Sequence, residues 1–212
     1  MKDWFFDEAF SAACPRFHDR GWEVVSLPDD FHQSLVKGYH EAFFKRRSAV
    51  PEGPDKRAVV NTLGLPTLSL NDDPAFDGVR DNPWLLAEME RFAGCPLVPS
   101  RRYGPRVATR GAVLVPHRDK PQTHLLGASI TVACDTDEPW LMVLENPDGR
   151  RDEVDLLPGQ ALLFEAVRMR HARPTPMKGK FYAGIFVHYL PADPGRLSPE
   201  FHELARRFEG AV

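Results

Sequence analysis

Three features that often reveal a protein's class are scarce in this sequence: cysteine, an excess of positive charge, and long apolar runs. The 212 residues include three cysteines, and no two of them stand in a C-x-x-C spacing. An odd number of cysteines without that spacing argues against a disulfide framework and against a zinc ribbon. We therefore expect a reducing, cytoplasmic setting.

The charge balance excludes further classes of partner. The formal net charge is −3 and no polybasic run occurs, so the chain lacks the basic field of a protein that binds nucleic acid or an anionic membrane surface. The N-terminal residues 1–10 are rich in aromatic side chains, but Asp3, Asp7 and Glu8 interrupt them, which argues against a signal peptide or a membrane span. We expect a small-molecule or amino-acid-type substrate, with no nucleic-acid and no membrane partner. The sequence does not indicate an oligomeric state.

The length suits a single domain that can bury a core of its own. We expect residues 1–95 to form helical and loop support, residues 96–191 a β-rich core, and residues 192–212 a C-terminal helix. Helix signals precede and follow the core: Asn82-Pro83 is typical of a helix start, Gly94 of a helix end, and Ser198-Pro199 of a second start. The irregular residues 48–77, rich in proline and glycine, are a candidate for part of a substrate entrance.

The core segment contains short apolar stretches separated by turns, a pattern typical of a jelly roll. The residues Leu157-Pro158-Gly159-Gln160 predict a type II turn between two of the stretches. The predicted strands cover residues 101–103, 111–115, 127–134, 140–145, 154–156, 161–165 and 181–189. The fold class expected is therefore mainly β with flanking helices.

A histidine and an aspartate stand two residues apart at the end of one apolar stretch, at His117 and Asp119. Residues i and i+2 of a strand point to the same face, so both side chains are expected in one cavity. His171 follows another apolar stretch and is expected on a neighbouring strand. Two histidines and one carboxylate with open metal positions form the facial triad of non-haem Fe(II) oxygenases. The triplet His-Arg-Asp also occurs in protein kinases, but the sequence lacks the asparagine, the glycine-rich loop and the DFG motif of that family.

Together with these three residues, several motifs resemble the Fe(II)/2-oxoglutarate-dependent dioxygenases, in particular the prolyl-4-hydroxylase-like branch. The matching stretches within residues 96–191 are RYG at 102–104, HRD at 117–119, LPGQALLFE at 157–165, HARP at 171–174 and GKFY at 179–182. The resemblance implies a double-stranded β-helix (jelly roll) with Fe(II) held by His117, Asp119 and His171. It also implies 2-oxoglutarate and O2 as co-substrates, and ascorbate as a stimulant. The implied reaction is hydroxylation of an unactivated C–H bond with conversion of 2-oxoglutarate to succinate and carbon dioxide.

One family position departs from the pattern. The resemblance implies a basic residue about ten positions after the distal histidine, to bind the far carboxylate of 2-oxoglutarate, but the tenth residue after His171 is Phe181. Lys180 is our first choice for this cation, and Arg173 is the second. Tyr103 resembles a family position whose hydroxyl binds the same carboxylate, although a packed tyrosine at a strand end is an equal alternative.

Two further histidines are left open by the sequence. His124 is expected in a solvated loop, with substrate contact as the alternative, and His188 is either a core histidine or a residue inside the barrel. Two other functions also stay open. A cupin-type metalloenzyme would use the same fold and metal without 2-oxoglutarate, and a non-catalytic jelly-roll binding module would use neither.

Overall fold

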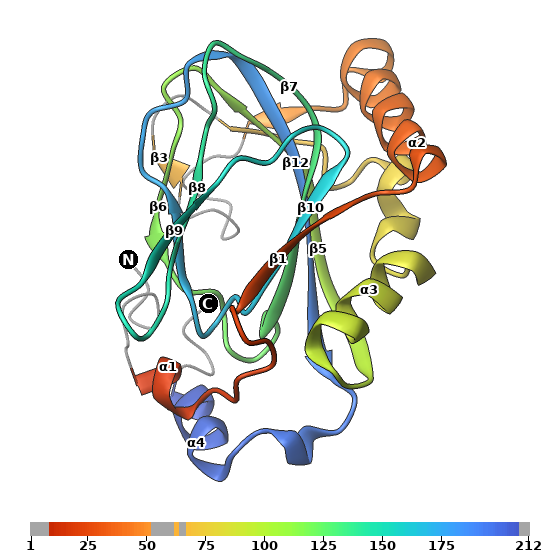
Figure 1. The fold of residues 1–212 in the computed structure, drawn as a ribbon. Helices are drawn as coiled ribbons and strands as arrows, with labels where there is room; N and C mark the ends of the chain where they lie inside the picture. Colours follow the sequence, from red (N-terminus) through yellow and green to blue (C-terminus); the bar gives the residue numbers. More distant parts are fainter. Residues whose placement is uncertain (1–8, 52–61, 64–66, 208–212) are drawn as a thin grey trace.

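Two β-sheets facing each other form the centre of the protein (Figure 1). The computed structural model describes residues 9–51, 62–63 and 67–207. Among these, the larger sheet has the order β1 (Trp22–Ser26), β10 (Gln160–Phe164), β7 (Leu126–Thr136), β12 (Gly179–Pro191), β5 (Leu97–Thr109), β4 (Leu68–Ser69) and β2 (Val50–Pro51). The smaller sheet has the order β3 (Thr62–Leu63), β6 (Val113–His117), β11 (Arg170–Arg173), β8 (Met142–Glu145) and β9 (Arg151–Val154). This antiparallel two-sheet arrangement is the jelly roll predicted from the sequence.

The strands of the two sheets are interleaved along the chain, so residues far apart in sequence become neighbours. The chain segment before residue 96 supplies β1, β2, β3 and β4, so it builds the edges of both sheets as well as the supporting helices. Of the core strands, β11 was not predicted as a separate element, and the other seven correspond to the predicted stretches.

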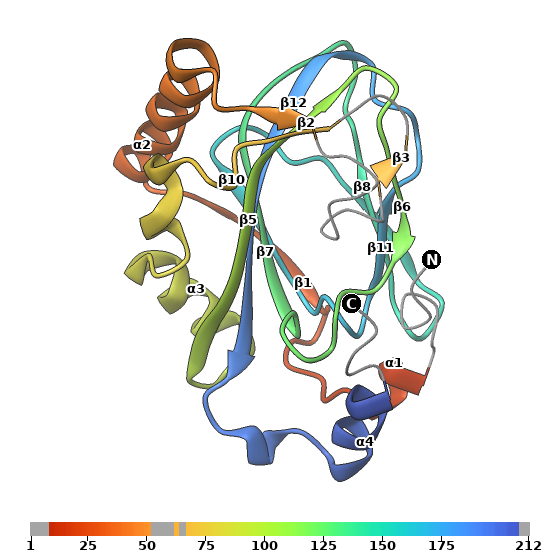
Figure 2. The ribbon, with the colours of Figure 1, turned by 180° about the vertical axis from the view of Figure 1, so that it is seen from behind.

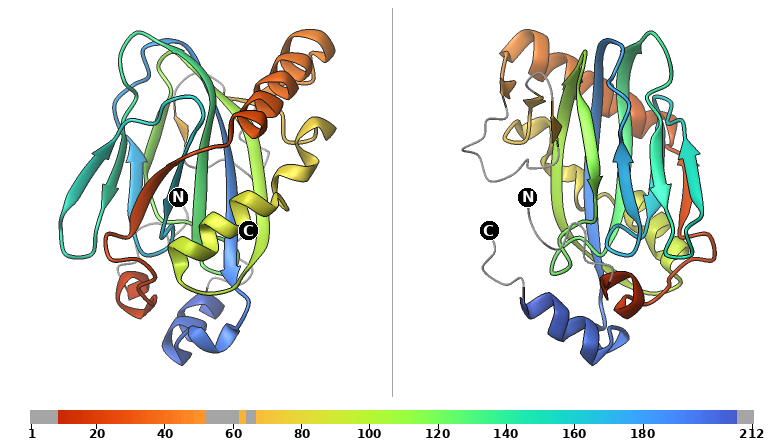
Figure 3. Two further views of the ribbon diagram at one scale, coloured as in Figure 1. Left: turned by 45° about the vertical axis from the view of Figure 1, so that its right-hand side comes forward. Right: turned by 90° about the vertical axis from the view of Figure 1, so that its left-hand side faces the viewer.

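Helices cover the outer face of the larger sheet (Figures 2 and 3). α2 (Asp29–His40) continues into a π-helical turn (Glu41–Arg46), and α3 (Pro83–Ala93) follows a 3-10 turn (Pro74–Val79). α3 has the predicted ends: the Asn82 side chain accepts a hydrogen bond of 3.0 Å from the Leu85 amide, and Gly94 has a φ of 63°. Leu35 of α2 and Met89 of α3 belong to one apolar cluster with the larger sheet.

The chain's end segments meet at the bottom of the jelly roll. α1 (Ala9–Ala13) packs against α4 (Pro199–Arg207), with the Phe10 and Phe201 rings 5.9 Å apart, and a 3-10 turn (Pro194–Arg196) precedes α4. The predicted start of α4 is confirmed, because the Phe201 amide donates to Ser198 Oγ at 3.0 Å. Residues 1–8, which precede α1, lie outside the described ranges. Within the described ranges, no helix has the length and apolar character needed to cross a membrane.

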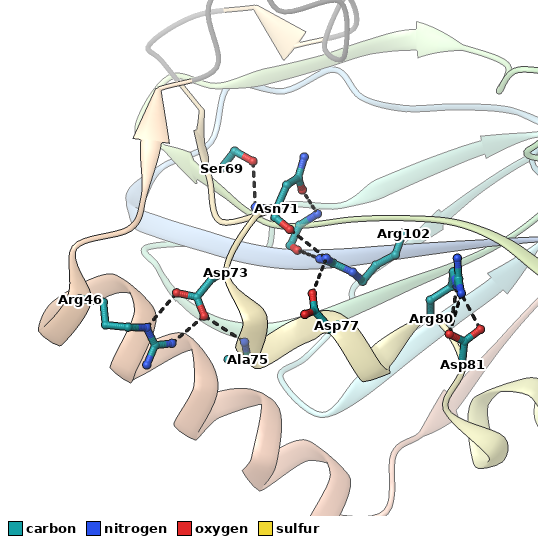
Figure 4. Close-up of polar contacts among 10 residues, drawn as sticks. Arg46, Ser69, Asn71, Asp73, Ala75, Asp77, Arg80, Asp81 and Arg102 are labelled. Atoms are coloured by element: carbon teal, nitrogen blue, oxygen red, sulfur yellow. Dashed lines mark hydrogen bonds and ion pairs between the residues drawn. The ribbon is translucent and has the colours of Figure 1, made fainter.

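A polar network around Asp73 fixes the segment that leads from β4 to α3 (Figure 4). The Asp73 carboxylate accepts hydrogen bonds from Arg46 at 2.6 and 3.0 Å, from Ser48 Oγ at 2.7 Å and from the Ala75 amide at 3.0 Å. Nearby, Arg102 of β5 donates to the Asn71 carbonyl at 2.8 Å. The described part of the suspected entrance is therefore anchored on the sheet and α2, and residues 52–61 and 64–66 of that segment lie outside the described ranges.

Glycine is required at two points of the barrel wall. Gly104 of β5 has a φ of +98°, and a Cβ atom there would lie 2.5 Å from the Gly184 carbonyl oxygen of β12. The close pairing of β5 and β12 therefore requires a residue without a side chain at position 104. The predicted type II turn is confirmed, because the Gln160 amide donates to the Leu157 carbonyl at 3.0 Å and Gly159 has a φ of +82°.

Candidate active site

The smaller sheet brings His117, Asp119 and His171 together. His117 ends β6 and stands directly opposite His171 of the antiparallel neighbour β11. Asp119 lies two residues past the end of β6, rather than within the strand as the i, i+2 argument assumes. Its Oδ1 atom is 3.6 Å from His117 Nε2 and 3.8 Å from His171 Nε2, and one ligand atom from each residue lies within 4.8 Å of the others.

Hydrogen bonds to the turn after β10 hold the segment around Asp119 in place. The Asp119 amide donates to the Ala166 carbonyl at 3.0 Å, and the buried Arg118 side chain donates to the Arg168 carbonyl. Because both the backbone and the neighbouring side chain are tied to this turn, the position of Asp119 is determined beyond the end of the strand.

Backbone carbonyl groups fix the orientation of both imidazoles. His117 Nδ1 lies 2.7 Å from the Val115 carbonyl oxygen, and His171 Nδ1 lies 3.2 Å from the Met169 carbonyl oxygen. A carbonyl only accepts hydrogen bonds, so each Nδ1 carries the proton and each Nε2 presents a lone pair. Such an outer hydrogen bond is typical of histidines that bind metals.

Burial controls the protonation of the three groups. It lowers the pKa of His117 to about 4 and that of His171 well below its usual value, which keeps both rings neutral. It raises the pKa of Asp119 to about 8, and the positive charge of Arg106 on β5 opposes that rise. Two neutral imidazoles and a carboxyl group that gains its negative charge on metal binding form a coherent donor set.

The three donor atoms fit one divalent ion. Imidazole nitrogen and carboxylate oxygen bind ions such as Fe(II) at about 2.0 to 2.2 Å, which brings adjacent ligand atoms roughly 3 Å apart. The observed separations of 3.6 and 3.8 Å from Asp119 Oδ1 require only small side-chain movements to reach that geometry.

A second polar group inside the barrel surrounds Arg173, the last residue of β11. Arg173 is 3 % exposed, its Nη2 donates to the Tyr182 hydroxyl at 2.8 Å, and its guanidinium lies 4.9 Å from the Trp140 ring centroid. The Tyr182 hydroxyl also contacts the hydroxyl of the buried Thr131. In the described part of the chain, Arg173 Nη1 is buried without a hydrogen-bond partner. A buried cation whose Nη1 lacks an acceptor within the described ranges would gain a partner from an anion that reached it.

Lys180, our first choice for the cation, lies elsewhere. Its side chain is 80 % exposed and pairs with Asp135 at 2.7 Å. We chose Lys180 because it stands one position before the expected residue and begins the last strand, and the strand register is irregular there, between Gly179 and Phe181. The structure thus brings Arg173, and not Lys180, to the interior that contains the metal-facing atoms.

Tyr103 lies on the Asp119 side of the barrel. Its ring stacks on His124 at 5.4 Å and meets the edge of His188 at 5.7 Å, and the Asp119 charge contributes to the raised pKa of its hydroxyl. On β5 it is five positions from Ala108, the residue that pairs with Tyr182, a distance of roughly 15 Å along a strand. Tyr182, and not Tyr103, is therefore the tyrosine that contacts Arg173.

The two open histidines are both buried beside the candidate metal-binding group. His124 is 8 % exposed, which contradicts the expectation of a solvated loop residue, and His188 is 5 % exposed inside the barrel. Sequence reasoning missed Tyr182, Thr131 and Arg106. The first two look like ordinary strand residues, and only the distance from Arg173 reveals them.

Among known proteins, the chain is similar to solved structures only at the level of the fold. No family model matches the chain, and no curated protein matches it. Solved structures do match. A prolyl hydroxylase from Trichoplax adhaerens, in complex with a hypoxia inducible factor peptide fragment, has a TM-score of 0.59 at 11% identity, covering 87% of this chain and 90% of its own. A 2OG-Fe(II) oxygenase family oxidoreductase from Burkholderia pseudomallei has a TM-score of 0.58 at 13% identity, covering 86% and 89%. This chain has the fold of the Fe(II)/2-oxoglutarate oxygenases.

Other structures with this fold differ in what they bind and catalyse. HygX from Streptomyces hygroscopicus, with nickel, 2-oxoglutarate and hygromycin B bound, has a TM-score of 0.56 at 14% identity, covering 81% of this chain and 83% of its own. An α-ketoglutarate-dependent epimerase and a carbocyclase from nogalamycin biosynthesis share the fold as well. At these identities the likeness concerns the fold, and the activity has to be argued from the side chains.

Proposed function

We propose that this protein is an Fe(II)/2-oxoglutarate-dependent oxygenase in which His117, Asp119 and His171 hold the metal and Arg173 binds the far carboxylate of 2-oxoglutarate. The observation that carries the proposal is the buried Arg173, whose Nη1 has no hydrogen-bond partner within the described ranges. It lies two residues from His171 on the same strand, so one short segment would hold both the metal and the co-substrate.

The metal-binding part of the proposal rests on the converging donor atoms. Both histidines present Nε2 lone pairs toward Asp119 Oδ1, and three protein ligands leave positions on a six-coordinate ion for small molecules. When bound, Fe(II) with 2-oxoglutarate and O2 supplies an oxidant strong enough to attack an unactivated C–H bond.

The chain's own groups orient the co-substrate and exclude water. Arg173 presents a planar pair of donors that suits a carboxylate, and the Tyr182 and Thr131 hydroxyl groups add two further polar contacts at the same place. Trp140 covers the guanidinium on one side. A buried arginine with these neighbours supports the use of 2-oxoglutarate, and it has no evident purpose in a cupin-type enzyme that works without 2-oxoglutarate.

The reaction we propose is hydroxylation of a small molecule or an amino-acid residue, with succinate and carbon dioxide as co-products. The proteins with a similar fold include an epimerase and a carbocyclase. Whether attack on the C–H bond ends in hydroxylation therefore depends on the substrate.

The test is an anaerobic titration of the Fe(II)-loaded protein with 2-oxoglutarate. We expect a visible charge-transfer absorption from the chelated keto acid, and slow formation of succinate once air and ascorbate are admitted. His171→Ala is expected to abolish both signals, because it removes one of three protein ligands.

The alternatives give different results in the same experiment. Stoichiometric Fe(II) binding without the absorption band or succinate would contradict the proposal and favour a cupin-type enzyme. Failure to bind any divalent metal would favour a binding module.

A further inference from the structure

His188 of β12 lies against the side of Asp119 that faces away from the two candidate histidine ligands. His188 Nδ1 is 3.6 Å from Asp119 Oδ2, whereas Oδ1 of the same carboxylate faces His117 and His171. The two oxygens therefore have different neighbours. Oδ1 faces the two candidate histidine ligands, and Oδ2 faces His188 of the larger sheet.

The His188 ring is held firmly in this place. It is 5 % exposed, its centroid is 4.0 Å from that of His124, and the edge of Tyr103 closes another side. His124 is itself oriented, because its Nδ1 lies 2.6 Å from the Thr123 hydroxyl.

One polar atom of this ring lacks a hydrogen bond. Within the described ranges, His188 Nδ1 is buried without a hydrogen-bond partner, and leaving a buried donor unpaired is unfavourable. Asp119 Oδ2, 3.6 Å from this nitrogen, is a hydrogen-bond acceptor. A movement of about 0.6 Å would bring the pair to ordinary hydrogen-bond distance.

We propose that His188 is a positioning residue that donates its Nδ1–H to Asp119 Oδ2 and so keeps Oδ1 directed at the metal. The inference rests on the proposed metal site. A carboxylate that binds a metal through one oxygen can rotate about its Cβ–Cγ bond, and a fixed donor on the other oxygen removes that freedom. Partners of this kind typically change metal affinity by 10- to 100-fold when removed.

Three variants separate the hydrogen bond from mere packing. His188→Leu removes the donor and keeps an apolar side chain of similar reach. His188→Asn places an amide N–H near the position of Nδ1, and His188→Gln places it near the position of Nε2, away from Asp119. The measurement is the Kd for Co(II), determined by calorimetry on the metal-free full chain, together with the visible Co(II) spectrum and the melting temperature without metal.

We expect the Leu and Gln variants to bind Co(II) 10- to 100-fold more weakly than the wild type, with an altered Co(II) spectrum. The Asn variant should keep most of the wild-type affinity. If the Leu variant does not fold, the comparison of Asn with Gln decides the question.

Two results would overturn the inference. One is wild-type Co(II) affinity in the Leu or Gln variant, and the other is an equal loss in all three variants that follows their melting temperatures. A wild-type protein that binds no metal would contradict the proposed function itself, which distinguishes the two failures.

Discussion

At the scale of single residues, two cations separated by seven positions have opposite surroundings. Arg173 is buried between hydroxyl groups and rings, while Lys180 extends into solvent beside Asp135. An exposed ion pair adds little energy, whereas a buried guanidinium without an anion gains a great deal from binding one. The proposed co-substrate site therefore depends on the first residue and not on the second.

The corresponding prediction concerns the affinity for 2-oxoglutarate. Arg173→Leu is expected to raise its Kd by roughly 10- to 150-fold, because charge-assisted hydrogen bonds contribute about 1.5–3 kcal/mol. Arg173→Lys should give a smaller rise, since a lysine offers a point charge in place of two parallel donors. The measurement is the anaerobic titration of the Fe(II)-loaded variants.

Lys180→Ala is the matched control for this titration and should leave the Kd unchanged. A larger effect from Lys180→Ala than from Arg173→Leu would reverse the assignment.

A second residue-scale prediction concerns protons. The pKa of Asp119 is raised to about 8 by burial, so the acid is protonated below pH 8 and anionic above it. Metal binding needs the anion. The metal-free protein should thus release about one proton per Co(II) bound at pH 7, and progressively less above pH 8. Calorimetry in buffers of different ionisation enthalpy measures this number.

Asp119→Asn removes the titrating group and serves as the control for the proton count. The expected affinity of the wild type rises with pH up to about 8 and then levels off. A pH-independent affinity between pH 6 and 8 would contradict the assignment of Asp119 as the ligand that must ionise.

At the scale of elements, Asp73 joins three parts of the chain: the π-helical turn after α2, the start of the 3-10 turn, and Ser48. Its side chain is 1 % exposed. We expect Asp73→Ala to lower the free energy of unfolding by about 2–3 kcal/mol, because a buried capping carboxylate is lost and Arg46 is left without it. Urea denaturation measures the change.

The same residue predicts a pH dependence. Hydrogen bonds from Arg46 lower the pKa of Asp73 to about 2, below the unfolded value of about 3.9. Its contribution to stability is therefore complete above pH 4 and is lost as the pH falls through 2. The control is Asp81→Ala, which removes an exposed pair with Arg80 and should change stability by less than about 0.5 kcal/mol. Equal effects of both substitutions would contradict this account.

The elements also differ in how far the sequence predicted them. α3 was predicted with its ends, because Asn82, Pro83 and Gly94 act within a few residues of one another. A strand was expected at His171, but the bounds of β11 were not predicted, because its sequence Arg-His-Ala-Arg shows neither an apolar run nor alternation. Its strand conformation comes from pairing with β6 on one side and β8 on the other.

At the scale of the whole molecule, the proposed binding site for 2-oxoglutarate joins the two sheets. Arg173 belongs to β11 of the smaller sheet, and its partner Tyr182 belongs to β12 of the larger one. A ligand present at 100 times its Kd stabilises the folded state by about 2.7 kcal/mol. For a chain of this size we expect Co(II) and 2-oxoglutarate each to raise the melting temperature by roughly 5 to 10 °C.

The contribution of 2-oxoglutarate to that shift should disappear in Arg173→Leu, while the contribution of Co(II) stays. Thermal denaturation followed by circular dichroism, with and without each ligand, separates the two. An unchanged 2-oxoglutarate contribution in the variant would place the co-substrate elsewhere.

The sequence by itself determined the jelly roll, the capped helices and the three candidate metal ligands. Apolar periodicity, caps and turn residues act over short distances along the chain, so the sequence reveals them directly. Only the tertiary structure buried Arg173 and exposed Lys180, placed the Tyr182 hydroxyl against Arg173, and brought His188 close to Asp119. Those facts depend on an irregular strand register and on contacts across two sheets, and neither leaves a local pattern in the chain.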